Sequence, residues 1–240
     1  MNKSNIIYLA NSAAPAETPF YKKPWFLALS KLIYFFINGI PPLQKYVSKT
    51  LPFLNGRIPR PYRNEKYLEA LELSLLGLVK CNKNMEMNQY WWWSFLSHAV
   101  YCADCLKNTN IMNHLISMSE KVPRSYIGGN AAYCYCRFSY FKYDQEEYDY
   151  AIRFAELAKE ADDEYGEAYY LLGFYELFIN EGDPMAYFSA AVERDQKILG
   201  WITHHPNIKE FPSIINELTK LHQIMLKEHP SKSFRVLKVI

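Results

Sequence analysis

The chain has 240 residues, half of them apolar, and a formal net charge of +2. This length and apolar content suffice for a sizeable core, so the sequence excludes a globally disordered chain. The five cysteines are an odd number in a chain too long to need disulfide staples, which favours a reducing, cytoplasmic setting.

The charge is unevenly distributed along the chain. Residues 1–66 contain ten basic and two acidic residues, net +8, whereas the remaining residues contain 17 and 23, net −6. This asymmetry predicts a basic N-terminal part and an acidic helical body. We therefore expect a basic, proline-rich arm with one or two helices over residues 1–64, a helical domain over 65–230, and a C-terminal tail over 231–240.

The strongest apolar run of the arm is the segment from Trp25 to Ile40, which contains Lys31 and ends at a pair of prolines. It is shorter than the ~20 apolar residues that span a bilayer as a helix, so an internal or interfacial helix is predicted. Because residues 20–36 mix cations with aromatic rings, attachment of residues 20–50 to a membrane surface is an alternative function. Basic residues outside any known binding fold do not indicate nucleic acid, which we do not expect as a partner.

Apolar periodicity and turn residues predict that the rest of the chain is wholly helical. No segment alternates like a strand between hairpin turns. Asp183 followed by Pro184 is typical of a helix start, because the proline has no N–H to leave unsatisfied. The predicted helices cover approximately residues 65–81, 88–106, 111–121, 125–141, 146–161, 165–180, 184–199 and 212–228.

Two of these helix pairs carry a repeated pattern. Ala151 and Ala158 lie on a second helix, and Tyr169, Leu172 and Gly173 follow on the next first helix. This pattern resembles the tetratricopeptide repeat, in which small residues let two helices approach closely and an aromatic fills the adjoining gap. A weaker copy begins 36 residues earlier, so the resemblance covers about residues 125–196.

The resemblance implies an all-α fold in which antiparallel helix pairs stack as a short TPR-like α-solenoid. It also implies a scaffold that binds another protein rather than an enzyme, for example an adaptor, a chaperone or an immunity-type inhibitor. In such stacks the first helices line a groove. The candidate groove residues here are Tyr135, Arg137, Tyr140 and Tyr170, and ordinary packing between helices is the alternative explanation for the tyrosines.

An acidic segment adjoins these tyrosines. Residues 144–167 contain ten acidic residues and only two basic ones, so they predict either a solvated helix face or a surface that attracts a basic partner. The candidate partner-binding residues are Glu146, Glu147, Asp162, Asp163 and Glu164.

A metal site is an alternative hypothesis for the segment that contains His98, Cys102 and Cys105. These residues lie at i, i+4 and i+7 of one helix, and His114 is a possible fourth zinc ligand. Free cysteines are nevertheless common in helical cores. Because no phosphate loop, nucleophile elbow or zinc-protease motif is present, we expect no catalytic residues and no cofactor, and a metal-dependent enzyme remains the alternative.

Overall fold

The protein is described by a computed structural model. It describes residues 51, 54–56, 58, 64–82, 85–122 and 128–228, and gives only the backbone of residues 85–87, 226 and 228. The chain divides into two compact units, residues 1–126 and 127–240. Most of the predicted arm, including its apolar run and the membrane-binding segment 20–50, lies outside the described residues, as does the predicted tail.

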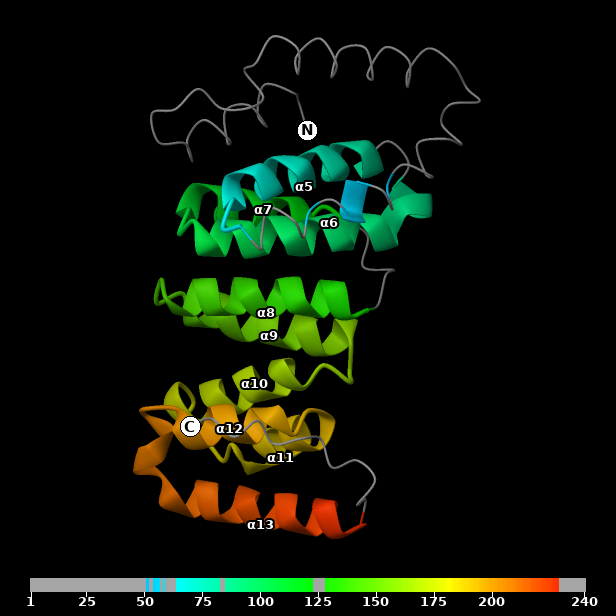
Figure 1. Ribbon diagram of the computed structural model, residues 1–240. Coiled ribbons are helices and arrows are strands. Elements are labelled where there is room, and N and C mark those ends of the chain that lie inside the picture. The colour runs from blue at the N-terminus through cyan, green and yellow to red at the C-terminus, as the bar shows by residue number, and fades with distance from the viewer. Residues whose placement is uncertain are drawn as a thin grey trace, which may run out of the picture. The chain divides into compact units, whose positions relative to one another are not determined.

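The described residues are helical, with no strand among them, as the sequence predicts (Figure 1). The first unit contains α5 (Tyr67–Cys81), α6 (Met85–Cys105) and α7 (Thr109–Ser119). The second contains α8 (Gly129–Tyr143), α9 (Tyr148–Ala161), α10 (Gly166–Phe178), α11 (Met185–Arg194), α12 (Lys197–His204), the 3-10 turn η3 (Ile208–Glu210) and α13 (Pro212–Glu228).

In the first unit, α5 and α6 form an antiparallel pair in which a glycine permits close contact. A Cβ atom on Gly77 would lie only 2.3–2.5 Å from three ring carbons of Phe95, so the phenylalanine ring rests directly on the α5 backbone. The turn after α6 places Asn108 at the start of α7, where its side chain accepts a hydrogen bond of 2.9 Å from the Ile111 N–H.

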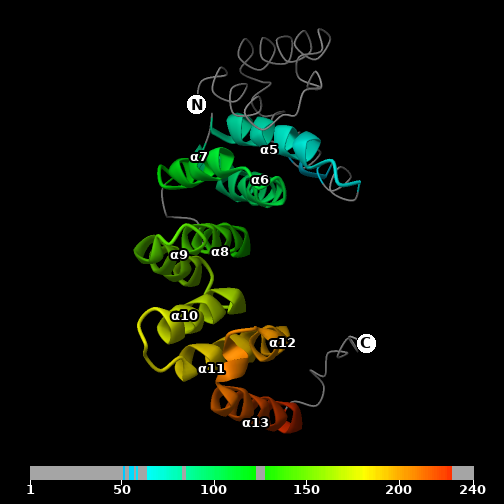
Figure 2. The same cartoon turned by 90° about the vertical axis from the view of Figure 1, so that its left-hand side faces the viewer.

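In the second unit, α8 pairs with α9 and α10 pairs with α11 (Figures 1 and 2). Gly173 of α10 repeats the role of Gly77, because a Cβ atom there would lie 2.6 Å from the ring of Phe188 on α11. A buried hydrogen-bond chain also joins three helices. Tyr175 of α10 donates to Ser139 of α8, and Ser139 donates to the Ala151 carbonyl oxygen of α9, both at 2.7 Å.

One turn recurs after 33 residues. Asp162 ends α9 and Asp195 ends α11, each in an extended conformation and each with its N–H bonded to the carbonyl of an alanine four residues earlier. Each aspartate side chain then accepts a hydrogen bond from the N–H two residues on, at 3.1 and 3.0 Å. The same aspartate turn thus ends both helices, although α10 begins at Gly166, four residues after its aspartate, and α12 at Lys197, two residues after its aspartate.

This turn corrects one predicted boundary. A continuous helix over 184–199 is wrong, because the chain leaves the helix at Asp195 and starts α12 two residues later. His204 ends α12 and His205 is its C-cap residue. The other predicted helices in the described residues are confirmed to within a few residues at each end.

Candidate functional site

Two of the predicted groove tyrosines are buried. Tyr135 stacks on Phe154 of α9 with ring centroids 6.3 Å apart, and Tyr170 stacks on Phe188 of α11 at 6.2 Å. Trp201 of α12 meets the Tyr170 ring edge-on at 6.0 Å. Both tyrosines therefore belong to the packed interior, where their rings fill the space between helices.

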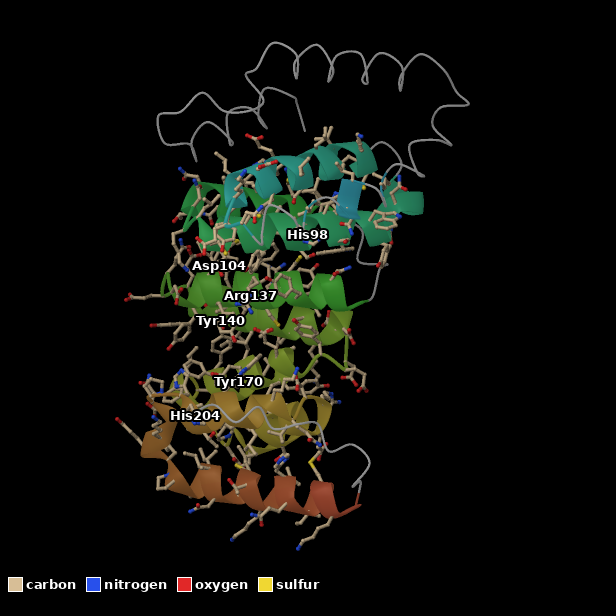
Figure 3. All side chains as sticks on the ribbon, in the orientation of Figure 1. His98, Asp104, Arg137, Tyr140, Tyr170 and His204 are labelled. Carbon is tan, nitrogen blue, oxygen red and sulfur yellow. The ribbon has the colours of Figure 1, made fainter. Side chains whose placement is uncertain are left out.

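Arg137 of α8, with Tyr140 beside it on the same helix, forms a joint with Glu167 of α10 (Figure 3 labels Arg137 and Tyr140). The Arg137 guanidinium carbon lies 5.3 and 5.2 Å from the ring centroids of Tyr133 and Tyr140. Its Nη2 atom donates to Glu167 Oε1 at 3.0 Å, and the Tyr165 hydroxyl donates to Glu167 Oε2 at 3.2 Å. The carboxylate is only 8% exposed and the arginine side chain 31% exposed. This cluster stabilises the contact between helices and offers a partner little free charge.

Burial has a second effect on this joint. It raises the pKa of the Tyr140 phenol well above its ordinary value, and the Glu167 carboxylate adds to the effect. The ring therefore stays neutral and presents its face to the Arg137 guanidinium, which suits a cation–π contact.

The acids of the α9–α10 turn are also engaged within the chain. Asp162 makes the turn described above, and Asp163 accepts a hydrogen bond from the Tyr169 hydroxyl and one of 3.3 Å from Arg194 of α11. The Arg194 guanidinium carbon lies 4.0 Å from the Tyr169 ring centroid. The hydrogen bond from Tyr169, followed by the bond and charge of Arg194, lowers the pKa of Asp163. Of the three predicted acids here, Glu164 is exposed and forms no ion pair with a described residue.

The acids of the α8–α9 turn differ because their carboxylates face solvent. Glu147 is held by Lys142, whose Nζ atom lies 3.0 Å from both of its carboxylate oxygens. Glu146 is exposed and has a positive φ of 62°, at the left-handed residue of the turn. The 14 residues of α9 separate this turn from the α9–α10 turn by about 21 Å at 1.5 Å per residue, so the predicted acidic residues form two separate groups.

Two exposed tyrosines follow the α8–α9 turn, at the first and third residues of α9. Tyr148 is 41% exposed and Tyr150 49%, although large aromatic rings are usually covered. We call the exposed group of Asp144, Glu146, Tyr148, Asp149 and Tyr150 the tyrosine–acid face. Sequence reasoning named only Glu146 of this group. Two tyrosines directly after an acidic turn are the signal that was available for the others.

No ion pair with a described residue neutralises the three carboxylates of the tyrosine–acid face. The Lys142 ammonium group lies 5.7 Å from the Tyr150 ring centroid while it pairs with Glu147. The face therefore combines two exposed rings with negative charge that is not compensated within the described part of the chain.

The candidate metal ligands do not form a metal site in the described residues. No group of three or more His, Cys, Asp or Glu side chains there has a geometry that would hold a metal ion. On α6, Cys102 is buried and Cys105 is partly buried. Burial lowers the pKa of His98 on the same helix, so its imidazole is neutral near pH 7.

Glu72 of α5 provides a pH-dependent prediction. Burial, followed by the charge of Glu69, raises its pKa from 4.5 to about 7, and its buried Oε2 has no hydrogen-bond partner among the described residues. A raised folded-state pKa contributes stability that is complete below pH 4.5 and is lost as the pH rises through 7. Because the group is partly exposed, we expect Glu72→Gln to stabilise the protein by only about 1 kcal/mol at pH 8, and by much less at pH 4.

Urea unfolding of both proteins at pH 4, 6 and 8 measures this difference. A difference between the wild type and Glu72→Gln that is the same at all three pH values would contradict the expected ionisation of Glu72.

No protein-family model, curated protein or solved structure matches the chain. Within the described residues, no helix combines the length and apolar character needed to cross a bilayer.

Proposed function

We propose that the chain is a non-catalytic, TPR-like helical-repeat protein that binds another protein through its tyrosine–acid face. Adaptor, chaperone and immunity-type inhibitor are the roles that this kind of binding would serve. The observation that carries the proposal is the pair of half-exposed tyrosines at the start of α9, beside three carboxylates that form no ion pair with a described residue.

The repeat assignment is supported by packing that recurs between helix pairs. Both α5 and α10 contain a leucine followed by a glycine, and each glycine lies against a phenylalanine ring of the following helix. The aspartate turn recurs after α9 and α11. Such repetition is typical of folds in which each helix pair contacts mainly its neighbours and function resides on exposed faces.

The binding surface is supported by the physical properties of its side chains. Tyrosine presents a large, rigid apolar ring with a polar hydroxyl and loses little conformational entropy when it is buried by a partner. Tyrosine is accordingly enriched among the residues that dominate interface energies. The neighbouring carboxylates add long-range attraction for a basic partner, which speeds encounter and selects the partner by charge.

Affinity capture with two matched variants tests the proposal. Tyr150→Ala and Tyr90→Ala each remove a tyrosine of nearly equal exposure, 49% and 52%, but only the first lies on the tyrosine–acid face. The tagged full-length protein and both variants are expressed in the native host, and the recovered proteins are quantified by mass spectrometry.

We expect a stoichiometric partner whose recovery falls about tenfold with Tyr150→Ala, corresponding to the loss of about 1.4 kcal/mol of binding energy. Tyr90→Ala should recover as much partner as the wild type. Recovery of no stoichiometric protein at low and moderate salt, or equal losses with both variants, would reject the proposed function.

A further inference from the structure

Two arginines of this chain each contact a tyrosine ring and pair with a carboxylate. Arg137 contacts the rings of Tyr133 and Tyr140 and pairs with Glu167. Arg194 of α11 contacts the Tyr169 ring and pairs with Asp163 of the α9–α10 turn. Each guanidinium therefore satisfies a ring and a carboxylate at the same time, which its flat shape and forked donors allow.

The tyrosine–acid face presents the same two chemical groups without an arginine. Its two rings are 41% and 49% exposed, and its carboxylates form no ion pair with a described residue. Arg153 of α9 is exposed and lies four residues after Asp149, yet it forms no ion pair with a described residue either. Tyr148 also contacts the Tyr143 ring and Lys142 lies near the Tyr150 ring, yet both tyrosines keep an exposed area beside carboxylates at the start of α9, which suits guanidinium groups.

We propose that the segment of the partner that docks on this face is arginine-rich. Its guanidinium groups stack on Tyr148 and Tyr150 and pair with Asp144, Glu146 and Asp149. This inference rests on the proposed function and narrows it to one partner chemistry. Arginine is favoured over lysine because a lysine ammonium is more strongly hydrated and has no flat face to lie against a ring.

Two synthetic peptides test the inference: nine arginines and nine lysines, each with the same fluorescent label. Their affinities for the protein are measured by fluorescence anisotropy at 0.05 and 0.15 M salt. The higher salt concentration screens unspecific electrostatic attraction more strongly. We expect the arginine peptide to bind at least about fivefold more tightly than the lysine peptide at both salt concentrations.

Variants of the rings separate stacking from charge. Tyr148→Leu with Tyr150→Leu should bring the two peptides to within about twofold of each other, whereas Tyr148→Phe with Tyr150→Phe should retain the preference for arginine. Circular dichroism confirms that both double variants keep the helical fold. Equal binding of the two peptides by the wild type, or a preference for arginine that survives in the leucine variant, would overturn the inference.

Variants of charge locate the site. Asp144→Asn, Glu146→Gln and Asp149→Asn together should weaken binding of the arginine peptide about tenfold. The control variant carries Glu156→Gln, Glu160→Gln and Glu193→Gln, which remove three other exposed acids. Apart from the effect of net charge that both triple variants share, it should change the affinity for the arginine peptide by less than about twofold. Arg153→Gln should strengthen binding, because it removes a competing positive charge. Equal weakening by the face variant and the control would assign the binding to net charge alone.

This inference and the proposed function can fail separately. If a partner is captured through Tyr150 but the segment that crosslinks to the face contains no arginine, the protein-binding function stands and the arginine inference is rejected. If no partner is captured, but the peptides show the predicted discrimination, the face recognises arginine and the proposed protein-binding role is the part that fails.

Discussion

Gly173→Ala should lower the free energy of unfolding by about 1–3 kcal/mol, the usual cost of forcing an extra carbon into a packed core. The new Cβ atom would lie 2.6, 2.8 and 3.2 Å from three carbons of the Phe188 ring. The ring is fully buried, so it cannot move aside without disturbing other core residues. Alanine favours a helix over glycine by about 1 kcal/mol, and we expect the steric cost to exceed this gain.

Gly200→Ala is the matched control, because it is the same exchange in a helix. No atom lies within 4 Å of a Cβ at Gly200, and the residue is exposed on α12. Here only helix propensity acts, and the variant should gain about 0.5–1 kcal/mol. Urea unfolding followed by circular dichroism measures both changes. If both variants were stabilised, α10 and α11 would not be in the close contact described.

Glu167→Ala should cost about 2 kcal/mol, the second of the two large effects. The substitution removes a carboxylate that is only 8% exposed and that accepts from both Arg137 and Tyr165. Breaking a fully buried ion pair costs about 3–5 kcal/mol, and the 31% exposure of Arg137 reduces this, because water can solvate the arginine after the change.

Glu164→Ala serves as the control for Glu167→Ala. This acid lies three residues earlier, is exposed and forms no ion pair with a described residue, so its loss should change stability by less than about 0.5 kcal/mol. Thermal unfolding of the two variants side by side measures the contrast. Equal midpoints would show that the carboxylate of Glu167 does not hold α8 and α10 together.

The helices of the described region were largely predictable, because apolar periodicity and turn residues act locally. The failure at α12 has a local cause as well. Asp195 lies within the helix predicted over 184–199. In the structure its side chain accepts a hydrogen bond from the Lys197 N–H and its backbone is extended. An aspartate fits both a helix and a turn, and its neighbours did not distinguish the two.

The candidate site was less predictable, because exposure depends on contacts between helices. Tyr170 is only 6% exposed because its ring packs against Phe188 and Trp201, whereas Tyr150 is 49% exposed. An aromatic ring suits a core and a binding surface equally well, so the sequence does not separate the two uses.

The acidic segment illustrates the same difficulty. Its charge count treated the acids as one surface, although Glu167 is buried in an ion pair, Asp163 contacts Arg194 and Glu146 is exposed at the other end of α9. Charge density along the sequence thus overstated the acidic surface and missed the two tyrosines, Tyr148 and Tyr150, that accompany its exposed part.

Site-specific photocrosslinking in the native host tests most directly whether the tyrosine–acid face binds a protein. The photoreactive residue p-benzoylphenylalanine replaces Tyr150 in one strain and Tyr90 in another, because the two side chains are nearly equally exposed, at 49% and 52%. We predict that illumination joins one distinct protein to the chain at position 150 and none at position 90. Crosslinks at position 90 alone, the same products at both positions, or no product at position 150 would contradict the account.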